Sequence, residues 1–412
     1  IAPADPPQTV SAYIEWVNRG YAGEMRYLER PDRVERRRDP SLIVPNVKSV
    51  VVVGKNYFTR QLPPEILNDP SRGIIASYAW GLDYHDVMTP RLYQLQAFIQ
   101  EQVGSKVYGR TYVDTGPVLE REYAVRAGLG FFGKNTMLIH PRWGAWLFLG
   151  EILLDVELAY DKPDPRGTCG ACTRCLDTCP TDAFPEPYVL DSRRCISYFT
   201  IELKGPIPWA LRPLMGNRVF GCDICNEVCP WNRRFARPAE EQGSGGAGEQ
   251  VGRGAGERGR KGEREKGRKG RRGEGEKGRG EVSTHLFTLA ALPSGTEDVA
   301  PKLLDLIALD DEAFRERFRG SPIKRAKRRG LLRNVAVALG NWGDPVAVPA
   351  LTQALHDHEP LVRGHAAWAL GQIDSAHAQR ALKKVLVTED DDYVRNEIGA
   401  ALRIVAEVME VI

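Results

Sequence analysis

The chain has 412 residues, of which 42% are hydrophobic and 27% charged, and it carries 57 Lys+Arg against 54 Asp+Glu. This length gives room for about two to four domains, each with a buried core. No run of about 18 apolar residues occurs, so we expect no membrane-spanning helix. The chain starts at Ile1 without a basic and apolar leader, which argues against a signal peptide and favours a clipped N-terminus.

Residues 1–160 have the pattern of a mixed α/β domain. Four consecutive valines at 50–53 predict a buried strand, and apolar residues at helical spacing predict a helix over 91–103. Two further apolar runs, 146–149 and 152–154, are also typical of strands.

All eight cysteines lie between positions 169 and 229. The first four form the run C-x2-C-x2-C-x3-C-P, which is typical of bacterial ferredoxins whose fourth cysteine binds the other of two clusters. We therefore interpret residues 161–238 as a module for two [4Fe-4S] clusters. Structural zinc favours two CxxC knuckles with a longer spacer, and a disulfide framework requires an oxidising compartment, so both alternatives fit the spacing less well.

Two clusters need eight thiolates, and the chain supplies eight. The crosswise rule assigns cluster 1 to Cys169, Cys172, Cys175 and Cys229. Cluster 2 then takes Cys179, Cys222 and Cys225 and lacks one ligand. Cys195 is the remaining cysteine, so we assign it to cluster 2.

A segment at 239–283 is rich in Gly, Lys, Arg and Glu, and its composition predicts disorder. Residues 241–282 alone hold 12 Lys+Arg and 8 Glu, so the rest of the chain has 45 basic against 46 acidic residues. The net positive charge of the chain therefore belongs to this insert. A solvated linker is the simpler interpretation, and loose binding to nucleic acid is the alternative.

Residues 284–412 have the pattern of an all-α domain of HEAT-like repeats. Similar motifs begin at Arg333, Arg363 and Arg395, so each helical hairpin needs its neighbour to bury its apolar face. A basic cluster precedes the first motif and consists of Lys324, Arg325, Lys327, Arg328 and Arg329. It is either a solvated basic face or a site for phosphate groups, and we favour the second because the rest of the folded chain is near neutral.

Several motifs occur together in one order: VDTGPVLEREYAVRAGLGFFGKNT (113–136), the cysteine array, CISYFTIELKG (195–205), GNRVFGCDIC (216–225), CPWN (229–232) and SPIKRAKRRGLLRN (321–334). With these motifs the chain resembles the epoxyqueuosine reductases, from about residue 10 to the C-terminus except for the insert. Members of this family usually begin with an additional upstream segment. The resemblance therefore implies that the first domain of this chain is truncated at its N-terminus.

The resemblance implies an α+β multidomain protein, in which residues 1–160 form a cobalamin-binding domain similar to that of reductive dehalogenases. It further implies base-off cobalamin without a histidine ligand, and it assigns the role of proton donor to Asp114. From the residues alone, Asp114 could equally be a turn-forming or helix-capping side chain. The residues that the resemblance places at the cofactor are Arg37, Asp114, Lys134, Asn135, Thr136 and Leu138.

The implied activity is reduction of the epoxide of epoxyqueuosine at the wobble position of tRNA, which gives queuosine. Electrons would come from an external low-potential donor and pass through the two clusters to cobalamin, and the basic cluster would bind the anticodon stem-loop. The implied enzyme is a cytoplasmic oxidoreductase without a membrane partner, and we expect a monomer. The alternative function is an electron-transfer subunit of the diferredoxin type with a helical docking scaffold, which would leave residues 110–136 without a role.

Overall fold

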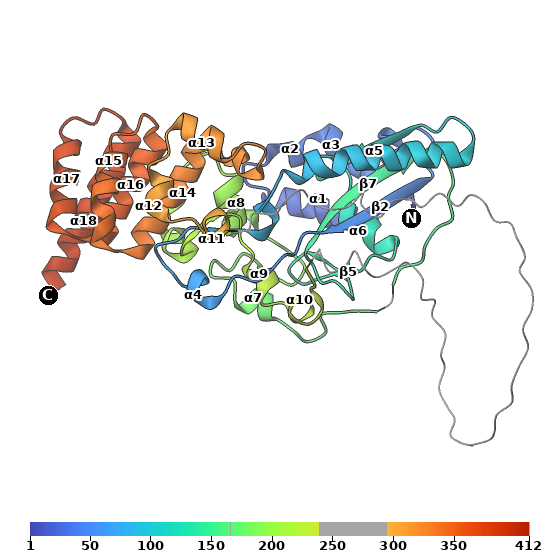
Figure 1. Ribbon diagram of the computed structural model, residues 1–412, viewed down its shortest axis with the longest axis horizontal. Helices are drawn as coiled ribbons and strands as arrows, with labels where there is room; N and C mark the ends of the chain where they lie inside the picture. Colours follow the sequence, from blue (N-terminus) through green and yellow to red (C-terminus); the bar gives the residue numbers. More distant parts are fainter. Residues whose placement is uncertain (165, 239–294, 412) are drawn as a thin grey trace, which may run out of the picture.

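The computed structural model describes residues 1–164, 166–238 and 295–411. The molecule is elongated, with the N-terminal sheet toward one end and the C-terminal helices stacked at the other (Figure 1). The insert predicted at 239–283 lies outside the described residues. Among the helices described, none combines the length and the apolar character needed to cross a membrane.

The N-terminal part is built on a four-stranded sheet with the order β1-β2-β7-β4, in which every pair is antiparallel. Its strands are β1 (Ala2–Pro3), β2 (Ser49–Asn56), β4 (Gly109–Tyr112) and β7 (Leu147–Leu154). The predicted valine strand lies in β2. The two apolar runs predicted between 146 and 154 are one strand, because Gly150 continues the ladder opposite Val53.

The valines of β2 point alternately to the two faces of this sheet, so both faces are apolar and both are covered by helices. Val51 packs with Met88 and Leu92 of α5, whereas Val52 packs with Tyr123 of α6. The helices of this part are α1 (Val10–Asn18), α2 (Arg26–Glu29), α3 (Pro31–Arg38), α4 (Pro64–Leu67), α5 (Tyr84–Val103) and α6 (Glu120–Arg126).

Helix α5 begins earlier than the helix predicted over 91–103. The Asp83 carboxylate accepts a hydrogen bond from the backbone N–H of His85 and so caps the helix at Tyr84. The additional turns include Tyr84 and His85, which the spacing of apolar residues did not place in the helix, and both side chains belong to the site described below.

The cysteine-rich module consists of short elements joined by turns. They are α7 (Arg174–Asp177), α8 (Ile196–Ile201), β8 (Arg218–Phe220), α9 (Ile224–Glu227) and α10 (Pro230–Phe235). The paired strands β5 (Phe131–Phe132) and β6 (Leu138–Ile139) precede the module and pack against α6. Strand β3 (Ile74–Ile75) of the N-terminal part pairs in parallel with β8. A segment from the first predicted domain is therefore part of the module.

The C-terminal part is helical, as the repeats predict. Its helices are α11 (Thr296–Val299), α12 (Leu303–Ile307), α13 (Asp311–Arg317), α14 (Lys327–Trp342), α15 (Val348–Ala354), α16 (Pro360–Ile373), α17 (Ala376–Leu386) and α18 (Asp392–Val411). The three motifs that recur in the sequence lie on α14, α16 and α18, and these helices pack side by side (Figure 1).

One hydrophobic core runs from the N-terminal part into the helical repeats. It includes Ile75 of β3, Phe199 of α8, Phe220 of β8, Leu332 of α14 and Leu370 of α16. Backbone hydrogen bonds such as that from the Gly73 N–H to the Pro301 carbonyl reinforce the junction. The domain limits at 160/161 and 283/284 stay predictions, but this core ties the parts together.

Candidate active site

The four cysteines assigned to cluster 1 surround one cavity of about 220 Å³. Its lining consists of Cys169, Cys172, Cys175 and Cys229 together with Asn135, Ile139, Pro230 and Trp231. Cys175 lies on α7, and Cys229 directly precedes α10. Thiols from two separate segments therefore meet around a single centre, which is the arrangement that a [4Fe-4S] cluster requires.

The four cysteines assigned to cluster 2 also meet. Cys195 lies within electrostatic reach of Cys179 and Cys222, and Cys225 lies within reach of Cys222 and Cys195. All eight cysteines are free thiols. Cys195 directly precedes α8, and its assignment as the fourth ligand of cluster 2 stays a prediction.

Burial controls the ionisation of these thiols. It raises the pKa of Cys175 to about 11 and that of Cys222 to about 12, and it raises the pKa of Cys225 well above the ordinary value. Thiolates at these positions form at neutral pH only when a cation offsets the loss of hydration. Binding of iron therefore has to be coupled to release of the thiol protons.

Asp114 lies in the turn that follows β4, and its side chain is exposed. Its φ of 58° is in the left-handed region, which costs a non-glycine residue about 1 kcal/mol or more. The Tyr84 hydroxyl donates a hydrogen bond of 2.7 Å to Asp114 Oδ2, and Arg33 Nη1 donates one of 3.1 Å to the Thr115 carbonyl. The helix that follows begins after Leu119, so Asp114 does not cap it.

Tyr84 is the side chain that orients Asp114. Its ring stacks on Phe148 with centroids 4.3 Å apart, and the Arg325 guanidinium lies 5.7 Å from the ring centroid. Burial and the neighbouring Asp114 carboxylate keep the pKa of Tyr84 far above its ordinary value. The phenol therefore stays neutral and remains a hydrogen-bond donor.

Two residues of the basic cluster face the N-terminal part. Arg325 Nη2 lies 2.7 Å from Nδ1 and 3.0 Å from Nε2 of His85, of which the unprotonated nitrogen accepts its hydrogen bond, and Lys324 Nζ lies 3.6 Å from Asp83 Oδ2. These contacts bring one end of the helical repeats to the start of α5, next to Tyr84. The two cations thus border the Asp114 site.

The other members of the cluster differ in their surroundings. Arg328 is largely buried, where it forms an ion pair with Asp357 and donates to the Leu309 carbonyl. Arg329 lies 3.9 Å from a Glu359 oxygen. Lys327 is exposed and forms no ion pair with the residues that the structure describes. The prediction of a phosphate-binding face therefore depends mainly on Lys327, because its neighbours have partners within the protein.

Arg37 and Asp114 share the neighbour Tyr27, and their assignment to one cofactor site stays a prediction. Arg37 is 8% exposed, and its guanidinium lies 5.1 Å from the centre of the Tyr13 ring. Tyr27 lies within electrostatic reach of both Arg37 and Asp114, and burial raises the pKa of Tyr27 to about 12. Arg37, Tyr27 and Asp114 thus border the same region.

The segment 134–138 lies at the first cysteine quartet. Lys134 Nζ donates to the Gly170 carbonyl at 2.8 Å, and its backbone N–H lies 3.4 Å from Cys169 Sγ. Asn135 donates to Asn226, Thr136 has a φ of 66°, and Leu138 belongs to β6. Within the described ranges, no hydrogen bond or ion pair joins this segment to Arg37 or Asp114.

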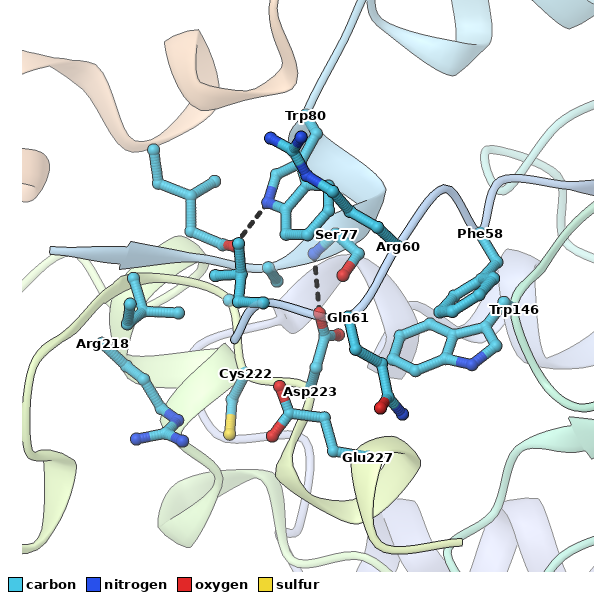
Figure 2. Close-up of a pocket in the computed structure, with 15 residues that line it drawn as sticks. Phe58, Arg60, Gln61, Ser77, Trp80, Trp146, Arg218, Cys222, Asp223 and Glu227 are labelled. Atoms are coloured by element: carbon cyan, nitrogen blue, oxygen red, sulfur yellow. Dashed lines mark hydrogen bonds between the residues drawn. The ribbon is translucent and has the colours of Figure 1, made fainter. Parts of the chain in front are cut away.

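A pocket lies between the N-terminal part and the second quartet. Figure 2 shows Phe58 and Trp146 on one side, with Cys222 and Asp223 across from them. The Asp223 carboxylate accepts a 2.6 Å hydrogen bond from the Ser77 backbone N–H. The Trp146 indole N–H is buried and has no hydrogen-bond partner among the described residues.

The sequence analysis missed Tyr84, Trp146 and Asp223. Tyr84 stands directly after the residue that caps α5, and this local signal could have placed it at a helix start. Trp146 precedes a strand and resembles any core aromatic residue. Asp223 stands between two cluster ligands, and nothing in its sequence neighbourhood shows that it binds Ser77.

Three family models match the chain. Residues 37–115 match the model described as "Epoxyqueuosine reductase QueG, DUF1730", residues 168–232 match a 4Fe-4S double cluster binding domain, and residues 324–403 match HEAT repeats. The last two matches confirm the predictions of a module for two [4Fe-4S] clusters and of HEAT-like repeats.

Similar proteins are known by sequence and by structure. The epoxyqueuosine reductase of Pseudomonas aeruginosa is 39% identical over 362 residues, which are 86% of this chain and 84% of that protein. A crystal structure of epoxyqueuosine reductase with an epoxyqueuosine-modified tRNA-Tyr stem loop has a TM-score of 0.77 and 29% identity, covering 98% of this chain and 93% of that one. The Bacillus subtilis enzyme, solved with an aspartate-bearing catalytic loop swung out of the active site, has a TM-score of 0.76 and 28% identity at the same coverage.

Proposed function

Because this chain belongs to the epoxyqueuosine reductase family, we propose that it reduces the epoxide of epoxyqueuosine at the wobble position of tRNA to give queuosine. The observation that carries this proposal is the Asp114 turn, whose carboxylate is held by the Tyr84 hydroxyl. A plain electron-transfer subunit would need the cysteine quartets but not a carboxylate oriented on a strained turn. The reductase therefore explains more of the structure.

Cobalamin is the cofactor that we propose for this site, bound base-off. The pocket of about 20 Å³ is too small to enclose the corrin ring, so Phe58 at its wall would contact only an edge of the ring. Arg37 and the segment 134–138 would hold other parts of the periphery. Cobalamin supplies strongly reducing electrons to carbon centres, which no amino-acid side chain provides.

Tyr78 and Tyr57 lie between the Asp114 turn and the second cysteine quartet. Tyr78 is within electrostatic reach of both Asp114 and Asp223, and Tyr57 is within reach of Asp223 and Cys225. The side chain of Asp114 is exposed, so a substrate can approach it from the surface of the protein. The two [4Fe-4S] clusters supply one-electron transfer from an external low-potential donor.

Asp114 is the proposed proton donor. Its Oδ2 accepts the Tyr84 hydrogen bond, which leaves Oδ1 to carry the acidic proton toward the substrate oxygen. The left-handed backbone and the Arg33 contact to Thr115 fix the turn in the absence of other side-chain bonds to the carboxyl group. The chain thus orients the donor through the neutral Tyr84.

The tRNA anticodon stem-loop is the proposed partner, and the reaction would take place in the cytoplasm on a monomeric enzyme. The wobble nucleoside has to leave its stack to reach Asp114. Of the basic cluster, Lys327 would contact phosphate groups directly, whereas Lys324 and Arg325 border the site through Asp83 and His85.

We test the proton-donor assignment with the Asp114→Asn variant. Loss of a general acid should lower the single-turnover rate of epoxyqueuosine reduction by about 100-fold or more, with cluster content unchanged. The measurement is mass analysis of wobble nucleosides after anaerobic incubation of modified tRNA with cobalamin and a low-potential reductant. Asp305→Asn is the matched control, because Asp305 is an exposed residue of α12, and it should keep the wild-type rate. A wild-type rate in Asp114→Asn would contradict the assignment.

A further inference from the structure

Two glutamates lie behind the Asp114 turn. Glu151 is in the middle of β7, opposite Tyr112 of β4 and Val52 of β2, and it is 0% exposed. Glu120 is the first residue of α6. The carboxylate of Glu120 accepts a hydrogen bond from the Asp114 backbone N–H, so the pair reaches directly to the turn that carries the proposed proton donor.

Glu151 has no partner that would stabilise a buried negative charge. Among the described residues, neither of its carboxyl oxygens receives a hydrogen bond from an N–H or O–H group. Its carboxyl group faces that of Glu120, within hydrogen-bonding reach. A fully ionised pair would place a second negative charge beside that of Glu151, whose side chain has no access to water, at a cost of several kcal/mol.

Such a pair is stable when the two carboxyl groups share one proton. The charged groups that face it are Asp114, Arg121 and Arg37, of which the arginines act on Glu120. Burial, together with the Asp114 charge, raises the pKa of Glu120 to about 7. Burial and the Glu120 charge raise the pKa of Glu151 well above its ordinary value.

The proposed reaction needs more protons than Asp114 carries. Conversion of an epoxide to an alkene and water consumes two electrons and two protons, and both protons end on the departing oxygen. The Asp114 carboxyl group can deliver only one proton at a time. A tRNA loop seated over the turn would restrict the access of solvent, so the second proton has to come from a group behind Asp114.

We propose that Glu120 and Glu151 together hold one proton and pass it to Asp114 during turnover, so that the site delivers both protons while the substrate covers it. This inference rests on the proposed function and adds a proton store to it. Glu120 and Glu151 are positioning residues, since they act through Asp114 and do not touch the substrate.

The first test is the pH dependence of the single-turnover rate in Glu151→Gln and Glu120→Gln. In wild type the pair supplies the proton, so the rate should be nearly constant between about pH 6 and 7. In the variants the proton comes from solvent, so the rate of each variant should fall by about tenfold for each unit of rising pH. At pH 8 each variant should be at least about tenfold slower than wild type. A small buffer acid such as imidazole should restore part of the rate. Glu101→Gln, exposed on α5, is the matched control.

The second test needs neither cobalamin nor tRNA. In infrared difference spectra of the cluster-loaded protein at pH 6, wild type should show the carbonyl band of a protonated carboxyl group, and Glu151→Gln should lack it. Because the pair holds one proton in the folded state and none in the unfolded state above about pH 4.5, wild type should lose stability as pH rises from about 4.5 through 7. The unfolding equilibrium constant should change by up to about tenfold per pH unit for the pair. Glu151→Gln should show a flatter profile.

The outcomes separate the two proposals. If wild type does not convert epoxyqueuosine, the proposed function fails, while the infrared band and the stability profile still report on the pair. If both variants keep the wild-type slope of rate against pH, or if Glu151→Gln keeps the carboxyl band, the proton store is wrong. A variant that does not fold is replaced by the other of the two.

Discussion

At the scale of single residues, Cys195 and Glu151 show what a sequence can and cannot reveal. Cys195 could be assigned because two clusters require eight thiolates and the chain has eight cysteines. Glu151 could not, because its partner Glu120 lies 31 positions earlier and the two meet where α6 packs against β7. Stoichiometry is visible in a sequence, whereas a buried carboxyl pair depends on the fold.

The assignment of Cys195 is tested by Cys195→Ser. Removal of this sulfur should destabilise cluster 2 alone, because the cavity of cluster 1 has its own four thiols. Iron content of anaerobically purified protein should fall from about eight to about four atoms per chain. Ser197→Ala, two residues further on in α8, is the control and should keep the wild-type content. Full iron content in Cys195→Ser would show that the ligand lies elsewhere.

At the scale of elements, the repeated helices were predictable and their contacts were not. The recurring motif predicts α14, α16 and α18, because its apolar residues have a helical period. It does not show that Arg333 is buried on α14 and donates to the carbonyls of Leu203 and Gly205. Those carbonyls belong to the loop after α8, so this arginine of the repeat binds the cysteine-rich module.

The close packing of α14 on α16 depends on Gly340. A Cβ at this position would lie 2.6 Å from the Trp368 ring and 2.9 Å from the Ala369 Cα. Gly340→Ala should therefore lower the stability by about 1–3 kcal/mol, because the helices would have to separate. Gly399→Ala on α18 is the control, since its Cβ would approach only the Arg403 side chain, at 3.6 Å, and alanine favours the helix.

Thermal unfolding followed by circular dichroism measures both glycine variants. We expect a lower melting temperature for Gly340→Ala and an unchanged or higher one for Gly399→Ala. Equal melting temperatures for the two variants would contradict the packing of α14 on α16.

At the scale of the whole molecule, the site forms where three parts of the chain meet. The N-terminal part contributes Asp114 and Tyr84, the cysteine-rich module contributes Cys222, and the basic cluster contributes Arg325. Residue types and spacing identified the cysteines, and family resemblance identified Asp114. The approach of Arg325 to Tyr84 could not be predicted, because it depends on how α5 and the turn before α14 are placed by the common core.

Binding of tRNA is the prediction that belongs to this scale. Lys327→Glu should weaken binding of a tRNA stem-loop by about three- to tenfold and reduce the slope of log affinity against log salt by about 1, because one phosphate contact is lost. Lys384 is an exposed residue of α17. Lys384→Glu therefore makes the same charge change elsewhere on the repeats and should have little effect. Equal losses in the two variants would indicate that net charge, and not this position, governs binding.

The most direct measurement of the central claim is made in cells. A bacterial strain without its own epoxyqueuosine reductase is supplied with this chain, and its tRNA nucleosides are analysed by mass spectrometry. We predict queuosine with wild type and with Asp305→Asn, and epoxyqueuosine with Asp114→Asn. Persistence of epoxyqueuosine with wild-type protein that is folded and loaded with iron, or restoration of queuosine by Asp114→Asn, would contradict the account.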